Sequence, residues 1–314
     1  MKRANDIGVA ALETQMQISQ ATGTDNTFEE DTDGVRTCRD LATMNWHSRN
    51  RRIVFVETSH HYVLDGVLTL ELSVTGVVSL FFPEFDAEAV VSMHFEKWAI
   101  DECSKYFDLI KAGRDAGYED REIKDKIIAT WANLGSVASS TCTYIHRQIE
   151  LALNDKEHDA QSKELHQFRD FMSTFVAPRN WQPYRTEWAI FDEQFHVAGQ
   201  IDCVFKVQDR DEYHMVDWKI LEKDVHELEN VRFKRYGRGP CSNMLDNKYN
   251  RFVAQQNLYA TILQRCYHID ICTMWLVQIQ QRREFFTCLR IPKETDLAID
   301  MLQRIKSDTK SEDA

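Results

Sequence analysis

Two short apolar segments that carry a few charged side chains constrain this chain more than any other feature. The first runs over residues 199–207 and the second over residues 213–219, with a polar turn at 208–212 between them. Apolar runs bounded by a polar turn predict two neighbouring strands. Asp217 and Lys219 then point to one face, because side chains two residues apart in a strand share a face.

Asp202 lies on the first of these strands, so its carboxylate is expected beside that of Asp217. Two carboxylates at that distance repel each other, and a divalent cation is the usual remedy. Lys219 places an ammonium on the same face, where it can hold a water or a phosphate oxygen beside the ion. A solvated surface hairpin carries the same residue types, so this interpretation depends on the rest of the chain.

Five patterns, in a fixed order along the chain, carry a resemblance to a known family: Thr143-x-x-His146, Glu187, Gly199-x-x-Asp202, Asp217-Trp-Lys219 and Gln255-x-x-x-Tyr259. In this order they resemble the PD-(D/E)XK nucleases of the RecB-like branch, which includes the mitochondrial genome maintenance exonuclease and related phage and viral enzymes. The likeness covers roughly residues 138–260, and a predicted hairpin near 60–75 extends it. Cys142 stands where the family has a glycine, which departs from its pattern.

The resemblance implies a metal site and a role for each of its residues. His146, Asp202 and Asp217 are expected to hold Mg²⁺ or Mn²⁺, together with the backbone carbonyl of Trp218. Hard oxygen ligands favour these ions, and one imidazole also suits Mn²⁺. Lys219 is expected to orient or deprotonate the attacking water and to stabilise charge in the transition state.

Other residues are expected to hold the substrate. Gln255 and Tyr259 are four residues apart, so they share one helix face, where the family positions DNA. Glu187 is expected to support a second metal or to pair with a basic neighbour, and an exposed strand glutamate is the plain alternative. In the relatives the hairpin flanks the DNA path, so Ser73 and Thr75 would offer hydroxyls to a phosphate, although Ser73 also suits an N-cap.

The net charge of −12 argues against a non-specific nucleic-acid coat protein. Residues 232–251 depart from this balance, because one acidic residue, Asp246, lies among six basic ones: Arg232, Lys234, Arg235, Arg238, Lys248 and Arg251. Tyrosines and glycines are interleaved with them, which suits phosphate contact and base stacking. The segment is therefore predicted to bind DNA, in particular single-stranded DNA.

The order of predicted elements indicates an α/β fold with a mixed central sheet flanked by helices. Four parts are expected: a disordered tail over 1–50, an N-terminal hairpin and helical region over 51–135, a PD-(D/E)XK nuclease core over 136–306 and a frayed tail over 307–314. Apolar periodicity predicts separate helices over 86–112, 119–131 and 138–153.

Apolar patterning and cysteine usage indicate the cellular setting. No run of 18 apolar residues occurs, which argues against a transmembrane helix, and no apolar segment follows the first residues as it would in a signal peptide. The eight cysteines contain no Cys-x-x-Cys pair, which favours reduced thiols over a zinc site. An intracellular, non-secreted protein is expected, and nuclear, mitochondrial and viral-replication settings stay open.

The resemblance implies a metal-dependent DNA exonuclease that hydrolyses phosphodiester bonds of single-stranded DNA or DNA ends and leaves 5′-phosphates. Such an enzyme serves replication, repair or recombination, so replication or repair proteins are further expected partners. A catalytically silent nuclease-fold module that binds DNA or a replication partner is the alternative, and it has no need of the lysine or the paired aspartates. Digestion polarity, exonuclease or endonuclease action, DNA or RNA preference, metal number and oligomeric state stay open.

Overall fold

A computed structural model describes residues 40–56, 59, 61–70, 72–221 and 235–312. Its centre is a six-stranded mixed sheet, which confirms the predicted α/β class. The sheet consists of β4 (Leu72–Ser73), β5 (Trp181–Asp192), β6 (Val197–Val207), β7 (Tyr213–Ile220), β8 (Ile271–Ile279) and β9 (Thr287–Ile291). A second, three-stranded antiparallel sheet consists of β1 (Ile53–Val56), β2 (His61–Leu64) and β3 (Leu68–Leu70).

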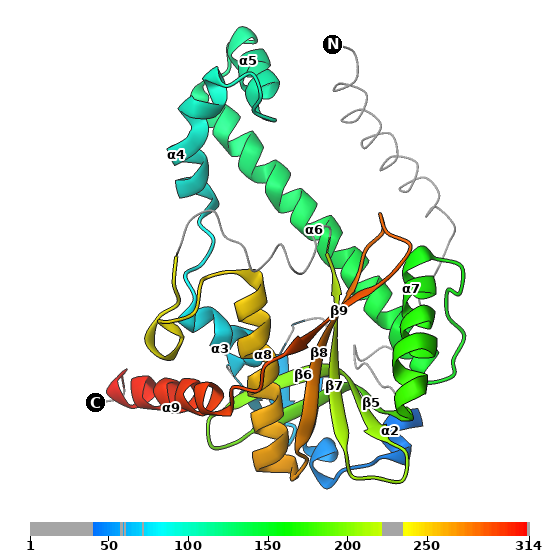
Figure 1. Ribbon diagram of the computed structural model, residues 1–314. Coiled ribbons are helices and arrows are strands. Elements are labelled where there is room, and N and C mark those ends of the chain that lie inside the picture. The colour runs from blue at the N-terminus through cyan, green and yellow to red at the C-terminus, as the bar shows by residue number, and fades with distance from the viewer. Residues whose placement is uncertain (1–39, 57–58, 60, 71, 222–234, 313–314) are drawn as a thin grey trace.

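Helices cover both faces of the central sheet, because each face presents a cluster of buried apolar side chains. On one face lie α3 (Val74–Phe81), α8 (Lys248–Ile262) and α9 (Thr295–Glu312). On the other lie α7 (Lys163–Phe171) and the C-terminal end of α6 (Asp120–Leu153). Figure 1 shows the sheet between these two layers.

A helical projection stands away from the sheet. It consists of α4 (Ala87–Ile100), α5 (Phe107–Asp115) and the N-terminal half of α6, and it has a small apolar cluster of its own. Figure 1 shows α6 running from this projection down to the sheet. None of the helices in the described part of the chain combines the length and the apolar character that crossing a membrane requires.

Several predicted boundaries were wrong. The helix expected over 86–112 is divided into α4 and α5, because Asp101 ends α4 as its C-cap. The helices expected over 119–131 and 138–153 are one continuous helix, α6, since no proline interrupts the sequence between them and the helix tolerates Gly135. Residues expected in the frayed tail after 306 continue α9 to Glu312.

The predicted N-terminal tail is also shorter than expected. Residues 1–39 lie outside the described part of the chain, but α2 (Asp40–Met44) and the 3₁₀ helix η1 (Ser48–Arg52) pack against the central sheet. Leu41 is buried, and its amide donates to Asn154 Oδ1 at 3.1 Å. The predicted tail over 1–50 is therefore wrong for residues 40–50, because Leu41 is buried against a surface formed much later in the sequence.

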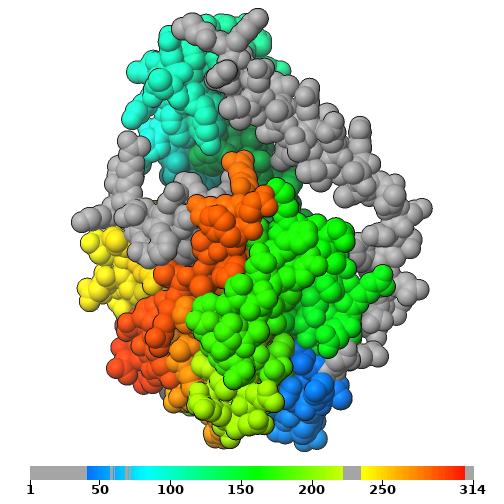
Figure 2. All heavy atoms as spheres, turned by 45° about the vertical axis from the view of Figure 1, so that its right-hand side comes forward, coloured from blue at the N-terminus to red at the C-terminus, as the bar shows by residue number. Residues whose placement is uncertain are grey.

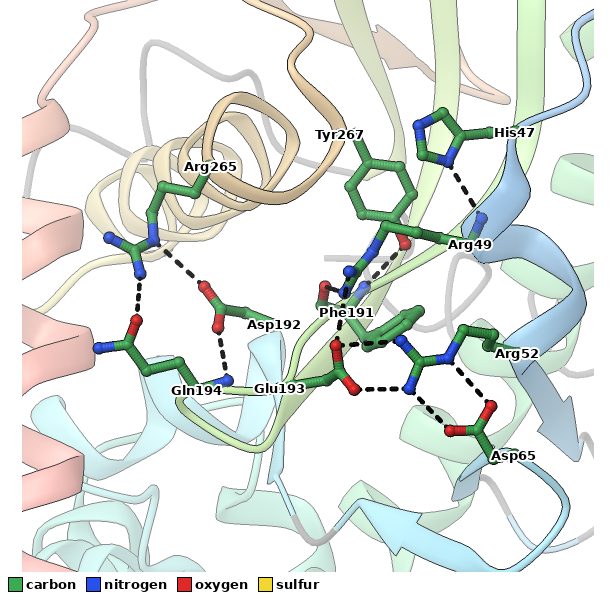
Figure 3. Close-up of polar contacts among 10 residues, drawn as sticks. All are labelled: His47, Arg49, Arg52, Asp65, Phe191, Asp192, Glu193, Gln194, Arg265 and Tyr267. Carbon is green, nitrogen blue, oxygen red and sulfur yellow. Dashed lines mark hydrogen bonds and ion pairs between the residues drawn. The ribbon is translucent and has the colours of Figure 1, made fainter.

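An ion-pair cluster fixes the small sheet over the central one. Arg52 makes two hydrogen bonds to Asp65 in the β2–β3 turn, at 3.0 and 2.7 Å, and also binds Glu193 in the β5–β6 turn. Arg49 donates to the carbonyl of Phe191 at 3.0 Å and lies over its ring. Figure 3 shows how these contacts join the two turns. The small sheet is thereby held beside β5, which contributes a residue to the candidate site.

Gly199 on β6 has a packing role that explains why a larger residue is not tolerated. A methyl group added at its Cα would lie 2.5 Å from Tyr259 Cε1 and 2.9 Å from Val74 Cγ2. The absence of a side chain therefore lets α3 and α8 approach the strand closely. Gly199 thus determines how near Tyr259 comes to the sheet.

We expect Gly199→Ala to lower the free energy of unfolding by about 1–3 kcal/mol, because the added methyl overpacks the core. Gly135→Ala is the matched control, since Gly135 lies in α6 with open space around it. There the change should raise the free energy of unfolding by about 0.5–1 kcal/mol through helix propensity. Urea unfolding of both variants provides the measurement, and an unchanged or stabilised Gly199→Ala protein would contradict the packing argument.

Candidate active site

The candidate site lies where β6 and β7 part. Their antiparallel pairing ends at Cys203 opposite Val216. Farther toward its start, β6 pairs with β4 instead of β7. Asp202 and Asp217 are the first residues beyond the last pair, as the sequence predicts for neighbouring strands. The amide of Trp218 donates to Asp202 Oδ2 at 2.8 Å, so a side chain replaces the next rung of the ladder.

Three side chains from three elements come together at this fork. His146 on α6, Glu187 on β5 and Asp202 on β6 each offer one ligand atom, and these atoms lie within 4.8 Å of one another. His146 Nδ1 is 3.6 Å from Asp202 Oδ2. One imidazole nitrogen and two carboxylate oxygens fit Mn²⁺ well and Mg²⁺ acceptably. The predicted ligands His146 and Asp202 are thus adjacent, and Glu187 belongs to the same group.

Glu187 has an unusual backbone conformation for a strand residue. Its φ is +42°, and it lies between the pairs Thr186–Cys203 and Trp188–Ile201, so it faces Asp202 across the ladder. A non-glycine residue in this region costs about 1–3 kcal/mol, and such strain concentrates at functional sites. The location beside His146 and Asp202 argues against the alternative of a merely exposed strand glutamate.

Asp217 and Lys219 form a buried ion pair beside this group. Lys219 Nζ is 2.6 Å from Asp217 Oδ2. Burial raises the pKa of Asp217 to about 6, Asp202 adds to the rise, and Lys219 opposes it. Among the described residues, the close ligand group contains Glu187 and does not contain Asp217. Asp217 is therefore adjacent to the ligands and paired with Lys219.

Lys219 is held as a cation. Burial lowers its pKa, but Asp217 and Asp202 raise it by more, so the net change is upward. Its Nζ also lies 4.8 Å from the ring centroid of Phe252 on α8. A lysine that stays protonated donates hydrogen bonds, which favours orienting a water or a phosphate oxygen over removing a proton.

Two tyrosines, Tyr62 and Tyr259, and Gln255 lie beside the carboxylates of the site. Gln255 Nε2 lies 3.3 Å from Tyr259 Oη, as the shared helix face predicts. Burial, reinforced by Tyr62, Asp217 and Asp202, raises the pKa of Tyr259 well above its usual value. Burial also raises the pKa of Tyr62, and Glu187 contributes. Both hydroxyls therefore keep their protons beside the carboxylates.

Sequence reasoning did not assign two of these residues. Tyr62 lies on β2, and its signal was the His-x-Tyr pattern before the Gly66 turn. Phe252 lies one turn before Gln255, and helical spacing from Gln255 was the signal for it. Both are aromatic residues, which a search for charged motifs does not consider.

The hydroxyls predicted to bind phosphate have partners within the protein. Ser73 Oγ accepts a hydrogen bond from the amide of Gly76 at 2.9 Å, so Ser73 is the N-cap of α3. Its Oγ also lies 2.8 Å from Thr75 Oγ1. The N-cap alternative is confirmed, and phosphate binding by this pair stays a prediction.

The basic segment is only partly described, because Arg232 and Lys234 lie outside the described residues. Arg235 and Arg251 both bind Asp246 at 2.8 Å, and both donate to the carbonyl of Pro83. These two arginines therefore attach the segment to the end of α3. Arg238 and Lys248 are exposed, and within the described ranges neither forms an ion pair.

Comparisons with known proteins add little to this geometry. No protein-family model matches the chain, and no curated protein matches it. One solved structure to which it is similar is described as "Crystal structure of SSO0001". The two share 13% sequence identity, with a TM-score of 0.27 over 76% of this chain and 75% of the other. A likeness at that level carries no argument about fold or function.

We expect His146→Ala and Glu187→Gln each to weaken Mn²⁺ binding by about tenfold to a hundredfold or more, since the loss of residues that merely orient ligands already costs that much. Isothermal titration calorimetry with Mn²⁺ measures this without requiring activity. His166→Ala is the control, because His166 is exposed on α7. Unchanged Mn²⁺ affinity in both site variants would show that the metal, if bound, lies elsewhere.

Proposed function

We propose that this protein is a metal-dependent DNA exonuclease with a PD-(D/E)XK core. One observation carries the proposal: His146, Glu187 and Asp202 converge within 4.8 Å, beside the buried pair of Asp217 and Lys219. A metal-ligand group next to a buried acid–lysine pair suits the hydrolysis of a phosphodiester. The five sequence patterns that resemble RecB-like nucleases supply every residue of this arrangement.

The charges of the site support the binding of one divalent cation. Three carboxylates, from Glu187, Asp202 and Asp217, lie around one ammonium, from Lys219, and this excess of acidic side chains favours a divalent cation. A bound Mg²⁺ or Mn²⁺ would polarise the phosphate and lower the pKa of a water. His146, Glu187 and Asp202 would hold the ion. Asp202 also lies close enough to Asp217 to raise the pKa of Asp217.

The remaining residues have roles that follow from their protonation. Lys219 is a cation, so it would orient the attacking water and stabilise negative charge that develops on the phosphate. The hydroxyls of Tyr259 and Tyr62 stay protonated and would donate to substrate oxygens rather than accept protons. Gln255 is hydrogen-bonded to Tyr259, which fixes the direction of that hydroxyl.

Digestion of end-labelled single-stranded and double-stranded DNA, with Mg²⁺, Mn²⁺ or EDTA, tests the proposal. We expect cleavage with either metal, none with EDTA, and products with 5′-phosphates. A silent DNA-binding module would bind the same oligonucleotides and leave them intact. Wild-type protein that binds Mn²⁺ and DNA but cleaves neither substrate would therefore overturn the proposed activity.

Lys219→Met should abolish most of the cleavage while Mn²⁺ binding persists, because the variant keeps the side-chain length and loses the ammonium. Lys206→Met is a closely matched control. Lys206 also pairs with an aspartate, Asp211 at 2.8 Å, and lies 5.2 Å from the ring centroid of Tyr213, but at the far end of β6. Gel-resolved turnover near the wild-type rate in Lys219→Met would refute the assigned role.

Arg238 and Lys248 are expected to contact phosphates, since they are exposed and, unlike Arg235 and Arg251, form no ion pair within the described part of the segment. For a single strand, each phosphate contact adds about −0.7 to the slope of log K against log salt. Arg238→Ala with Lys248→Ala should therefore flatten the slope by about 1.4. Arg210→Ala, an exposed arginine in the β6–β7 turn, is the control. Fluorescence anisotropy at several salt concentrations measures the slopes, and equal slopes in the double variant and wild type would place the groove elsewhere.

A further inference from the structure

The loop between β8 and β9, residues 280–286, lies at the same edge of the sheet as the candidate site. β7 and β8 are parallel, and Lys219 pairs with Gln278, so both strands run toward this edge. Gln280 lies two residues beyond Gln278, roughly 7 Å farther along the strand. Gln278 Nε2 also donates to the carbonyl of Leu221, which ties the two strand ends together. We call residues 280–286 the β8–β9 loop.

Buried polar contacts hold this loop in one conformation. Gln167 on α7 is fully buried, and its Nε2 donates to the carbonyls of Gln280 at 2.7 Å and Arg283 at 3.1 Å. Its Oε1 accepts from the amide of Gln280 at 3.0 Å. Lys163, also on α7, pairs with Glu284 at 3.2 Å. A buried amide that makes three hydrogen bonds to one loop is a specific anchor, since each would be costly to leave unmade.

The anchored loop exposes an aromatic ring beside two cations. Phe285 is 60% exposed, and the guanidinium of Arg283 lies 5.8 Å from the centroid of its ring. Arg282 is exposed, while Lys163 balances the one acidic residue of the loop, Glu284. Figure 2 shows this orange segment projecting beyond the surface around it. A ring that is 60% exposed contributes little to folding.

We propose that the β8–β9 loop binds single-stranded nucleic acid on its way to the candidate site, with Phe285 stacking on a base and Arg282 and Arg283 contacting phosphates. The inference rests on the proposed function and names a substrate contact for it. A flat ring beside guanidinium groups is the combination that sequence-tolerant single-strand binders use. Local positive charge in a chain of net charge −12 favours a polyanion. One exposed ring is far smaller than the roughly 800 Å² that each partner of a stable protein complex buries.

Anisotropy with a labelled oligo-dT in EDTA tests the proposal, because no metal is present to support cleavage. Phe285→Ala should weaken binding by about fivefold to a hundredfold, the usual effect of removing one stacking ring. Phe285→Trp should bind within about threefold of wild type, since it keeps a flat ring. With an oligonucleotide that lacks bases but keeps its phosphates, wild type and Phe285→Ala should bind equally.

An arginine variant and two control variants complete the test. Arg282→Ala should flatten the salt slope by about 0.7. Trp46→Ala removes an aromatic ring of the same 60% exposure, next to α2, and Arg210→Ala removes an exposed arginine in the β6–β7 turn; both should bind as wild type. Equal affinity of Phe285→Ala and wild type for oligo-dT would overturn the inference, even if the loop were then found to bind a protein.

This result is separable from the proposed activity. The loop is judged by the oligo-dT affinity of the Phe285 variants relative to wild type, so a loss of cleavage in Lys219→Met says nothing about it. Conversely, the wild type could cleave DNA while Phe285→Ala binds oligo-dT with unchanged affinity. That outcome would refute the role of the β8–β9 loop and leave the proposed activity standing. Thermal unfolding of each variant confirms that its fold persists.

Discussion

The parting of β6 from β7 at Asp202 is the constraint on which the candidate site depends. Directly opposed residues in an antiparallel ladder lie about 4.5–5.5 Å apart, where two carboxylates repel each other. The ladder ends one residue earlier, and the amide of Trp218 binds the carboxylate of Asp202 instead of a carbonyl. β4 then takes the free edge of β6. The fork thus leaves a polar opening between the strands without leaving that amide unpaired.

Several features of the site oppose folding, and together they indicate a ligand. Glu187 has a left-handed backbone conformation, and burial raises the pKa of Asp217 to about 6. A carboxylate with a raised pKa is destabilised in its charged form, so this part of the fold loses stability as the pH rises through about 6. A divalent cation among these carboxylates would reverse that loss. The surrounding ion pairs and the close packing at Gly199 keep the arrangement in place without one.

The sequence predicted β6 and β7 and the pairing of Gln255 with Tyr259 well, because strand alternation and helical spacing place side chains locally. It did not predict that Glu187 joins His146 and Asp202 more closely than Asp217 does, since that depends on a single backbone angle. It also missed the packing of residues 40–50, which bind a surface formed by β5 and α6. Asp246 looked like an exception in a basic segment, and it is the residue that two of the arginines bind.

Cys142 stands where the nucleases that the sequence resembles have a glycine, and its surroundings indicate whether its sulfur would compete with the candidate ligands. It lies one helical turn before His146, and burial raises the pKa of its thiol. Lys219 opposes that rise, while Asp202 and Asp217 reinforce it. The thiolate, not the thiol, is the metal ligand, so a sulfur that keeps its proton competes poorly for a cation. We therefore expect the two carboxylates and the imidazole, rather than this thiol, to decide which cation the candidate site prefers.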